Sequence, residues 1–132
     1  MKPATNASKL LIVLVEDDPG TREVFAIALE MEGFVVVTFE TAKQALDGIS
    51  ILAPAAVVAD LTLPGGVGGA DLVRQIRSES PELEAVPFFA VTGWDPRMIP
   101  AADTALFRQV FLKPVDVDVV GKAIRSAVAQ PD

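Results

Sequence analysis

Short runs of apolar residues alternate along the chain with longer stretches in which apolar residues recur every three or four positions. The short runs are typical of buried strands, and the longer stretches are typical of amphipathic helices. The predicted strands are Leu10–Val15, Phe34–Phe39, Ala55–Ala59, Val86–Val91 and Val110–Leu112. Because helical patterns separate these strands, the sequence predicts an α/β fold: a doubly wound, five-stranded parallel sheet with five helices on its two faces.

Particular residues mark the boundaries of two helices. Asp18 is the predicted N-cap of the first helix, and Gly33 stands where a glycine commonly follows a helix end. The apolar residues expected to form the buried face of this helix are Val24, Phe25, Ala28, Leu29 and Met31. Asp95-Pro96 is typical of a helix start, but Pro100 should shorten or kink that helix, so we expect it to be irregular.

The composition excludes several classes of chemistry. The chain has no cysteine and no histidine, so disulfides, thiol and imidazole nucleophiles, and thiolate or imidazole metal ligands are all excluded. A net charge of −7 and scattered basic residues argue against direct nucleic-acid binding. No apolar run is long enough to cross a membrane, and Met1–Lys9 lacks the apolar segment of a secretory signal. We therefore expect a cytoplasmic protein with a flexible segment at 1–9 and one domain over 10–129.

Polar residues follow the predicted strands at their carboxyl ends. They are Glu16, Asp17 and Asp18 after the first strand, Asp60 after the third, Thr92 after the fourth and Lys113 after the fifth. In doubly wound sheets ligands bind in the crevice beyond these ends, so we expect these side chains to lie close together. Each has an ordinary interpretation when taken singly, such as a solvated turn or a helix cap. Their joint occurrence at successive strand ends favours a functional site.

The residue types at these ends point to one kind of chemistry. Two carboxylates about 4 Å apart repel by about 4 kcal/mol at an effective dielectric of about 20, so a cluster of them raises a carboxyl pKa or recruits a cation. Oxygen ligands without histidine or cysteine favour Mg²⁺, or the similar Mn²⁺. Because Mg²⁺ readily binds phosphoryl oxygens, such a site suits phosphoryl transfer onto a carboxylate. Lys113 would then neutralise charge, and Thr92 would offer its hydroxyl to a phosphoryl oxygen.

Four segments of the chain resemble the motifs of one family, the receiver domain of two-component response regulators. They occur in the family's order and are Leu11–Pro19, Asp60–Pro64 with Gly68, Ala90–Gly93 and Phe111–Asp116. Each segment alone is a weak indication, whereas four in order are highly specific. The resemblance extends over nearly the whole chain, and it implies a flavodoxin-like fold, as in CheY, with strand order 2-1-3-4-5.

In this resemblance Asp60 is the phosphoacceptor. Glu16 and Asp17 are the acid pair that binds Mg²⁺, with Asp17 as the direct ligand, and Thr62 lends its backbone carbonyl to the metal. The phosphoryl donor would be a histidine on another protein, either a sensor histidine kinase or a histidine phosphotransfer protein, since this chain has none. The domain would catalyse its own phosphorylation and dephosphorylation without being a turnover enzyme.

The resemblance is less complete where the signal would be relayed. Thr92 would be the switch hydroxyl and Lys113 the phosphoryl-binding lysine, whose bond to Pro114 is a candidate for cis geometry. The family usually has an aromatic residue three positions before this lysine. Here that residue is Val110, a β-branched side chain with little reach, so the sequence leaves open whether an aromatic rotamer switch operates.

Further residues depart from the family pattern near the predicted site. Leu106-Phe107 stands where a glycine turn is common, and we expect Phe107 in the core, the alternative being an exposed anchor for a partner. Trp94, two residues after Thr92, flanks the phosphoryl group in this family; its bulk would hinder the attacking water, or it would merely cover apolar surface. The glycine-rich turn Gly65–Gly69 is expected to be a flexible loop beside the site rather than a phosphate-binding loop.

The leading functional hypothesis is a phosphorylation-controlled signalling module. Its output would pass to a downstream protein or an attached output domain. The chain would be a monomer or a weak dimer through the face formed by its last strand and the two flanking helices. The alternatives are a pseudo-receiver, which binds partners without accepting phosphate, and a Mg²⁺-dependent phosphatase with an aspartyl-phosphate intermediate. The phosphatase would require a general acid where this chain has Thr62.

Overall fold

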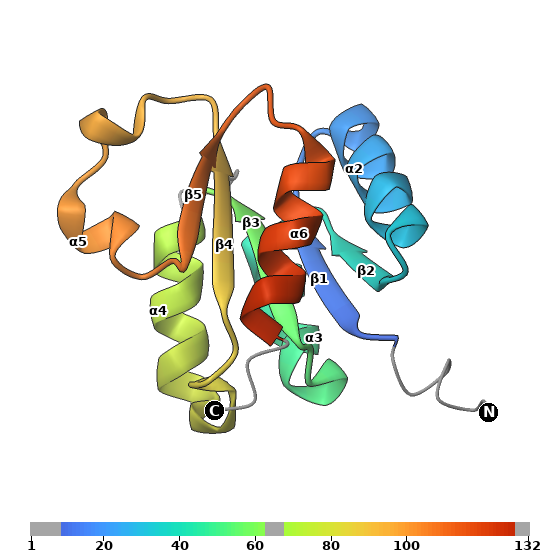
Figure 1. Cartoon of the computed structure of the whole chain (residues 1–132). Helices are drawn as coiled ribbons and strands as arrows, with labels where there is room; N and C mark the ends of the chain where they lie inside the picture. Colours follow the sequence, from blue (N-terminus) through green and yellow to red (C-terminus); the bar gives the residue numbers. More distant parts are fainter. Residues whose placement is uncertain (1–8, 63–67, 129–132) are drawn as a thin grey trace.

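A five-stranded parallel sheet forms the centre of the computed structural model, which describes residues 9–62 and 68–128 (Figure 1). Its strands are β1 (Leu11–Val15), β2 (Val35–Phe39), β3 (Ala56–Asp60), β4 (Phe88–Thr92) and β5 (Gln109–Leu112). All neighbouring strands are parallel, and their order in the sheet is β2-β1-β3-β4-β5. The predicted fold class and strand order are therefore confirmed.

Helices cover both faces of this sheet, as the alternating pattern predicts. Their bounds are α2 (Pro19–Met31), α3 (Ala42–Leu52), α4 (Gly69–Glu79), α5 (Ala101–Thr104) and α6 (Val117–Val128), with short 3₁₀ turns η1 (Pro81–Leu83) and η2 (Pro96–Met98). One buried cluster joins the sheet to α3 and α4, and a second joins it to α2 and α6. Figure 1 shows α2 and α6 next to each other on the same side of the sheet.

The central strands contribute side chains alternately to the two clusters. In β1, Val13 and Val15 pack toward α3 and α4, whereas Ile12 and Leu14 pack toward α2 and α6. All four are fully buried, as expected for a parallel sheet with both faces covered. Apolar contacts therefore fix the strands in register, and the register determines which residues meet at the carboxyl ends.

Helix α2 has the predicted ends but a narrower buried face than predicted. Asp18 caps its start by accepting a hydrogen bond from the Thr21 amide at 2.8 Å, and Gly33 follows its end with a φ of 102°. The assignment of Val24 and Met31 to the buried face is wrong, because both side chains are exposed. These residues are seven apart and so lie on one face of the helix, which turns away from the sheet.

The segment between β4 and β5 is irregular, as Pro100 predicts. Asp95 accepts a hydrogen bond from the Arg97 amide at 2.9 Å and starts η2, which ends at Met98. Pro100 then stands at the N-cap of α5, a helix of only 4 residues. The proline cannot donate a backbone hydrogen bond, so one continuous helix does not form across it.

Some predicted features fall wholly or partly outside the described residues. These are the flexible segment 1–9, of which only Lys9 is described, and the turn Gly65–Gly69, of which only Gly68 and Gly69 are described. Residue 129, the predicted end of the domain, also lies outside them. Within 9–62 and 68–128, no helix has the length and apolar character needed to cross a membrane.

Candidate functional site

Strand register brings the predicted acidic residues together. Val15 of β1 is paired with Ala59 of β3, so the residues that follow, Glu16 and Asp60, lie side by side. Both are buried, with exposed fractions of 1% and 6%. Carboxylate oxygens of Glu16, Asp17 and Asp60 all lie within 4.8 Å of one another. The predicted cluster is therefore present at the carboxyl edge of the sheet.

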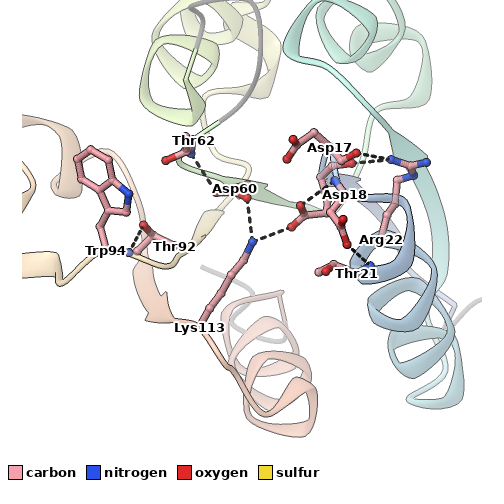
Figure 2. A network of polar contacts seen from close by, with 10 residues as sticks. Asp17, Asp18, Thr21, Arg22, Asp60, Thr62, Thr92, Trp94 and Lys113 are labelled. Carbon is pink, nitrogen blue, oxygen red and sulfur yellow. Dashed lines mark hydrogen bonds and ion pairs between the residues drawn. The ribbon is translucent and has the colours of Figure 1, made fainter.

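Lys113 supplies the positive charge next to this cluster. Its Nζ atom lies 2.8 Å from Oδ2 of Asp60 and 3.1 Å from Oε1 of Glu16 (Figure 2). The residue follows β5, and its amide donates to the carbonyl of Thr92 at 2.7 Å, which ties it to the end of β4. The Lys113–Pro114 peptide bond is cis, as the family resemblance implies.

Burial and ion pairing shift the pKa values of two of these groups. Burial raises the pKa of Glu16, although hydrogen bonds from the Asp18 amide and Lys113 oppose the increase. Burial on its own would lower the pKa of Lys113, but its hydrogen bonds to Asp60 and Glu16 outweigh that effect and raise it. Lys113 therefore remains charged at neutral pH, and it faces two carboxylates.

The third acid of the β1–α2 loop has a different role. Asp18 is the N-cap of α2, and hydrogen bonds from Thr21 hold the pKa of its carboxyl below the usual value. Its carboxylate is thus engaged by the helix start, and it does not belong to the group formed by Glu16, Asp17 and Asp60. The two acids that precede it are therefore the ones placed at the candidate site.

Two threonines flank the acidic group. The amide of Thr62 donates to Oδ1 of Asp60 at 2.9 Å, which fixes one carboxylate oxygen while Lys113 holds the other. The side chain of Thr92 is buried, and its hydroxyl oxygen accepts a hydrogen bond from the Trp94 amide at 3.0 Å. The metal-binding role of the Thr62 carbonyl stays a prediction.

Trp94 stands at the edge of the site. The residue is 62% exposed and contributes, with Thr62 and Thr92, to the lining of a cavity of about 330 Å³. Figure 2 shows its indole beside Thr92, away from Lys113 and the acidic loop. The proposed effect on an attacking water stays a prediction.

The residues behind this edge are packed into the core. Phe107 is buried, so its interpretation as a core residue is confirmed, and the alternative of an exposed anchor is wrong. Val110 is paired with Ala90 of β4 and, like Leu106, packs against the same cluster as α3 and α4. Aliphatic packing replaces the aromatic residue that the family usually has at position 110.

The acidic group fits a divalent cation by its charge and its ligand type. Three carboxylates converge, and Lys113 is the one cationic side chain among the described residues that contacts them. The group therefore retains an excess of negative charge, and its donors are the oxygens that Mg²⁺ and Mn²⁺ prefer. Glu16, Asp17 and Asp60 would hold the metal.

Sequence reasoning missed one residue that contacts the acidic loop. Nη1 of Arg22, in the first turn of α2, donates to the backbone carbonyls of Glu16 at 2.9 Å and Asp17 at 3.3 Å. The only signal in the sequence is its position, because the helix dipole opposes a cation near a helix N-terminus. This position does not identify the groups that Arg22 contacts.

Comparison with known proteins defines the class to which this fold and site correspond. The family model described as the response regulator receiver domain matches residues 12–125, and the chain belongs to this family. A solved structure of a CheY-like receiver domain from Methylobacillus flagellatus is 30% identical in sequence, with a TM-score of 0.81. The similarity covers 91% of this chain and 99% of that one.

Two curated relatives differ in how much of their length this chain spans. An uncharacterised 14.6 kDa protein of Leptolyngbya boryana is 34% identical over 108 residues, which cover 80% of this chain and 79% of that protein. The DNA-binding response regulator MtrA of Mycolicibacterium smegmatis is 39% identical over 82 residues, which cover 62% of this chain but only 34% of MtrA. This chain thus spans about a third of the second relative's length.

Proposed function

We propose that this chain is a phosphoacceptor domain that receives a phosphoryl group on Asp60 and thereby alters a surface recognised by a partner. The observation that carries the proposal is the environment of the Asp60 carboxylate. One oxygen is held by the Thr62 amide and the other by Lys113, and the carboxylates of Glu16 and Asp17 lie beside it. This environment orients a nucleophile and provides compensating charge for an incoming phosphoryl group.

Different residues of the chain would bind the metal and attack the phosphorus atom during phosphoryl transfer. A bound Mg²⁺ or Mn²⁺, held by Glu16, Asp17, Asp60 and the Thr62 carbonyl, would neutralise charge on the phosphoryl oxygens. An oxygen of Asp60 forms a bond to phosphorus while the bond between phosphorus and the donor nitrogen breaks. The donor imidazole leaves with its electron pair and takes up a proton.

Lys113 and Thr92 would bind the phosphoryl group after its transfer to Asp60. Lys113 already contacts Asp60, so its ammonium group is in place to pair with a phosphoryl oxygen when the acyl phosphate forms. The Thr92 hydroxyl accepts its hydrogen bond from the Trp94 amide and keeps its own proton to donate to a phosphoryl oxygen. Movement of Thr92 would displace the β4–α5 segment, which joins the site to the face formed by α5, β5 and α6.

The proposal also defines the partners. The physiological donor would be a phosphohistidine of a sensor kinase or a histidine phosphotransfer protein, and that histidine would belong to the partner, since this chain has none. Output would pass to a downstream protein or an attached domain through the α5–β5–α6 face, and the chain would be a monomer or would form a weak dimer through this face. The net charge of −7 favours protein over nucleic acid as the direct partner, and we propose a cytoplasmic location.

Mass spectrometry after treatment with acetyl phosphate and Mg²⁺ tests the proposal. The wild-type chain is expected to gain one phosphoryl group, and Asp60→Asn is expected to gain none. Omission of Mg²⁺ should reduce the gain in the wild type. A wild-type chain that stays unmodified would contradict the proposal and favour a pseudo-receiver. Continuous hydrolysis of a phosphomonoester would instead favour the phosphatase.

A further inference from the structure

The contact of Arg22 with the acidic loop is unusual for its place in the helix. Arg22 lies in the first turn of α2, where the partial positive charge of the helix N-terminus disfavours a cation. Its Nη1 atom nevertheless turns back to the loop before the helix and donates to the carbonyl oxygens of Glu16 and Asp17. Figure 2 shows the guanidinium group directed at this loop. The Arg22 side chain therefore binds the backbone carbonyls of both acids and forms no ion pair with their carboxylates.

The two acids differ in how their side chains are held. The Glu16 carboxylate accepts hydrogen bonds from Lys113 at 3.1 Å and from the Asp18 amide at 3.2 Å. The Asp17 carboxylate accepts none from the residues that the structure describes. Its direction is therefore set by the main chain at position 17. Arg22 holds this main chain through the two carbonyls on either side of the Asp17 Cα, and the hydrogen bond from the Asp18 amide to the Glu16 carboxylate holds the peptide group that follows.

We infer that Arg22 is a positioning residue for the proposed metal site: through the Glu16 and Asp17 carbonyls it keeps the Asp17 carboxylate directed toward Asp60. The inference rests on the proposed function, because it concerns the Mg²⁺ bound there. Outer contacts of this kind orient metal ligands, and their loss typically weakens metal binding by about 10–100-fold. Arg22 would act through Asp17 without touching the metal or the phosphoryl group.

The charge of Arg22 and its contacts with the loop lead to opposite predictions for the Mg²⁺ affinity of a variant that lacks this arginine. A guanidinium close to a cation site repels the cation, so its loss would strengthen Mg²⁺ binding if charge alone mattered. Loss of the two carbonyl contacts frees the loop and would weaken Mg²⁺ binding. A role confined to the stability of the loop would leave the affinity for Mg²⁺ unchanged and lower only the melting temperature. The direction of the change therefore separates the three roles.

Isothermal titration calorimetry with Mg²⁺ as the only ligand provides the measurement. We expect Arg22→Met to weaken Mg²⁺ binding by about tenfold or more. The matched control is Arg97→Met, which removes an arginine from an exposed ion pair with Asp95 and is expected to leave the affinity within about twofold of wild type. Thermal unfolding in EDTA shows whether each variant is folded. Arg22→Lys, which keeps the charge on a shorter side chain, is a second variant should Arg22→Met not fold, and is expected to bind Mg²⁺ more weakly than wild type.

Each outcome decides between the roles. Weaker binding by folded Arg22→Met, or by Arg22→Lys in its place, supports the positioning role. An affinity equal to or greater than that of wild type overturns it. Absence of Mg²⁺ binding in the wild-type chain overturns both this inference and the proposed metal site. Binding by wild type together with unchanged binding by the Arg22 variants overturns this inference alone and leaves the proposed function standing.

Discussion

The two ends of the proposed signalling route are built in different ways. The receiving part, which consists of Glu16, Asp17, Asp60 and Lys113, stands on the ends of β1, β3 and β5, and its members contact one another. The relaying part consists of the segment from Thr92 through α5 to Val110. This segment contains a helix of 4 residues, a 3₁₀ turn and the exposed Trp94.

This difference suggests that the site of phosphoryl transfer is rigid, whereas the segment that passes the signal on is mobile. The acidic group derives its precision from strands that are buried on both faces, which suits a site where small displacements are costly. The α5 segment has few buried side chains and is joined to α4 by an ion pair between Arg74 and Asp103. Segments with few buried contacts open at low free-energy cost, and elements that move are drawn from them. Substitutions should therefore have large effects in the receiving part and small ones in the relaying part.

Replacement of Lys113 is expected to have the largest effect. Lys113→Met leaves the buried Glu16 and Asp60 carboxylates without their shared cation, which should lower the free energy of unfolding by about 2 kcal/mol, less than for a fully buried pair because the lysine side chain is 30% exposed. Phosphorylation by acetyl phosphate should also become very slow. Urea unfolding in EDTA measures the first effect and mass spectrometry the second. The control is Lys43→Met, which removes an exposed lysine paired with Asp47.

The pH dependence of this effect has a definite sign. The pKa of Lys113 is raised in the folded state, so its contribution is complete below the ordinary lysine pKa and is lost as the pH rises through the raised value. In Lys113→Met the loss of stability should shrink on acidification, because the Glu16 carboxylate, whose pKa burial raises, becomes protonated. A deficit that grows on acidification would contradict this account and the tight coupling assigned to the receiving part.

Glu16→Gln tests whether the buried carboxylate of Glu16 lowers the stability of the metal-free protein while it strengthens Mg²⁺ binding. Because burial raises the pKa of Glu16, its charged form is disfavoured in the folded state, and wild-type stability should rise as the pH falls through that raised pKa. Glutamine keeps an acceptor for Lys113 and the Asp18 amide without the buried charge. We expect Glu16→Gln to stabilise the metal-free protein by about 1 kcal/mol at neutral pH and to weaken Mg²⁺ binding.

Urea unfolding in EDTA at neutral and mildly acidic pH measures this gain, which should diminish in acid. Glu23→Gln, which removes an exposed carboxylate from α2, is the control and should change neither stability nor affinity appreciably. A less stable Glu16→Gln protein at neutral pH would show that the ion pair with Lys113 outweighs the cost of burying the carboxylate.

The residues of the receiving part can be predicted from the sequence because they lie at the ends of strands. Once the apolar runs define parallel strands, the residues that follow Val15 and precede Leu61 must meet at one edge of the sheet. The strand limits are less predictable. The strand predicted from Val86 begins at Phe88, and Pro87, which has no N–H to donate, lies between the two positions. Such shifts leave the carboxyl end and the site unaffected.

Two other features could not be predicted, for physical reasons. Arg22 binds backbone carbonyls, which every residue possesses, so no pattern of side chains identifies its partners. Val24 and Met31 are apolar and have helical spacing, but spacing does not tell which face of α2 meets the sheet. The structure of the relaying part is the hardest to predict from sequence, because its helices and turns are too short to show a clear periodicity of apolar residues.

Trp94→Ala tests the connection between the two parts. The indole lies beside Thr92 and contributes to the cavity that Thr62 also lines, so its removal should give water easier access to a phosphoryl group on Asp60. We expect dephosphorylation of the alanine variant to be severalfold faster than that of wild type. Trp94→Phe, which keeps a ring, should lie between them. An unchanged rate would mean that Trp94 only covers apolar surface and belongs to the relaying part alone.

The smallest effect is expected at the ion pair between α4 and α5. Nη2 of Arg74 lies 2.6 Å from Oδ1 of Asp103, and the two side chains are 44% and 28% exposed. Because solvent screens such a pair, Arg74→Met should lower the free energy of unfolding only slightly. A double-mutant cycle with Asp103→Asn isolates the pair, since Arg74 also contacts Asp71.

The consequence of breaking this pair should be local. Hydrogen exchange of the α5 amides is expected to accelerate in Arg74→Met, whereas the amides of β1 and β3 should keep their protection, because the buried strands open only on global unfolding. Mg²⁺ affinity should not change, since no residue of the acidic group is involved. Equal acceleration in α5 and in the central strands would show that the relaying part is as firmly integrated as the receiving part. The contrast between a rigid site and a loosely held output segment would then no longer hold.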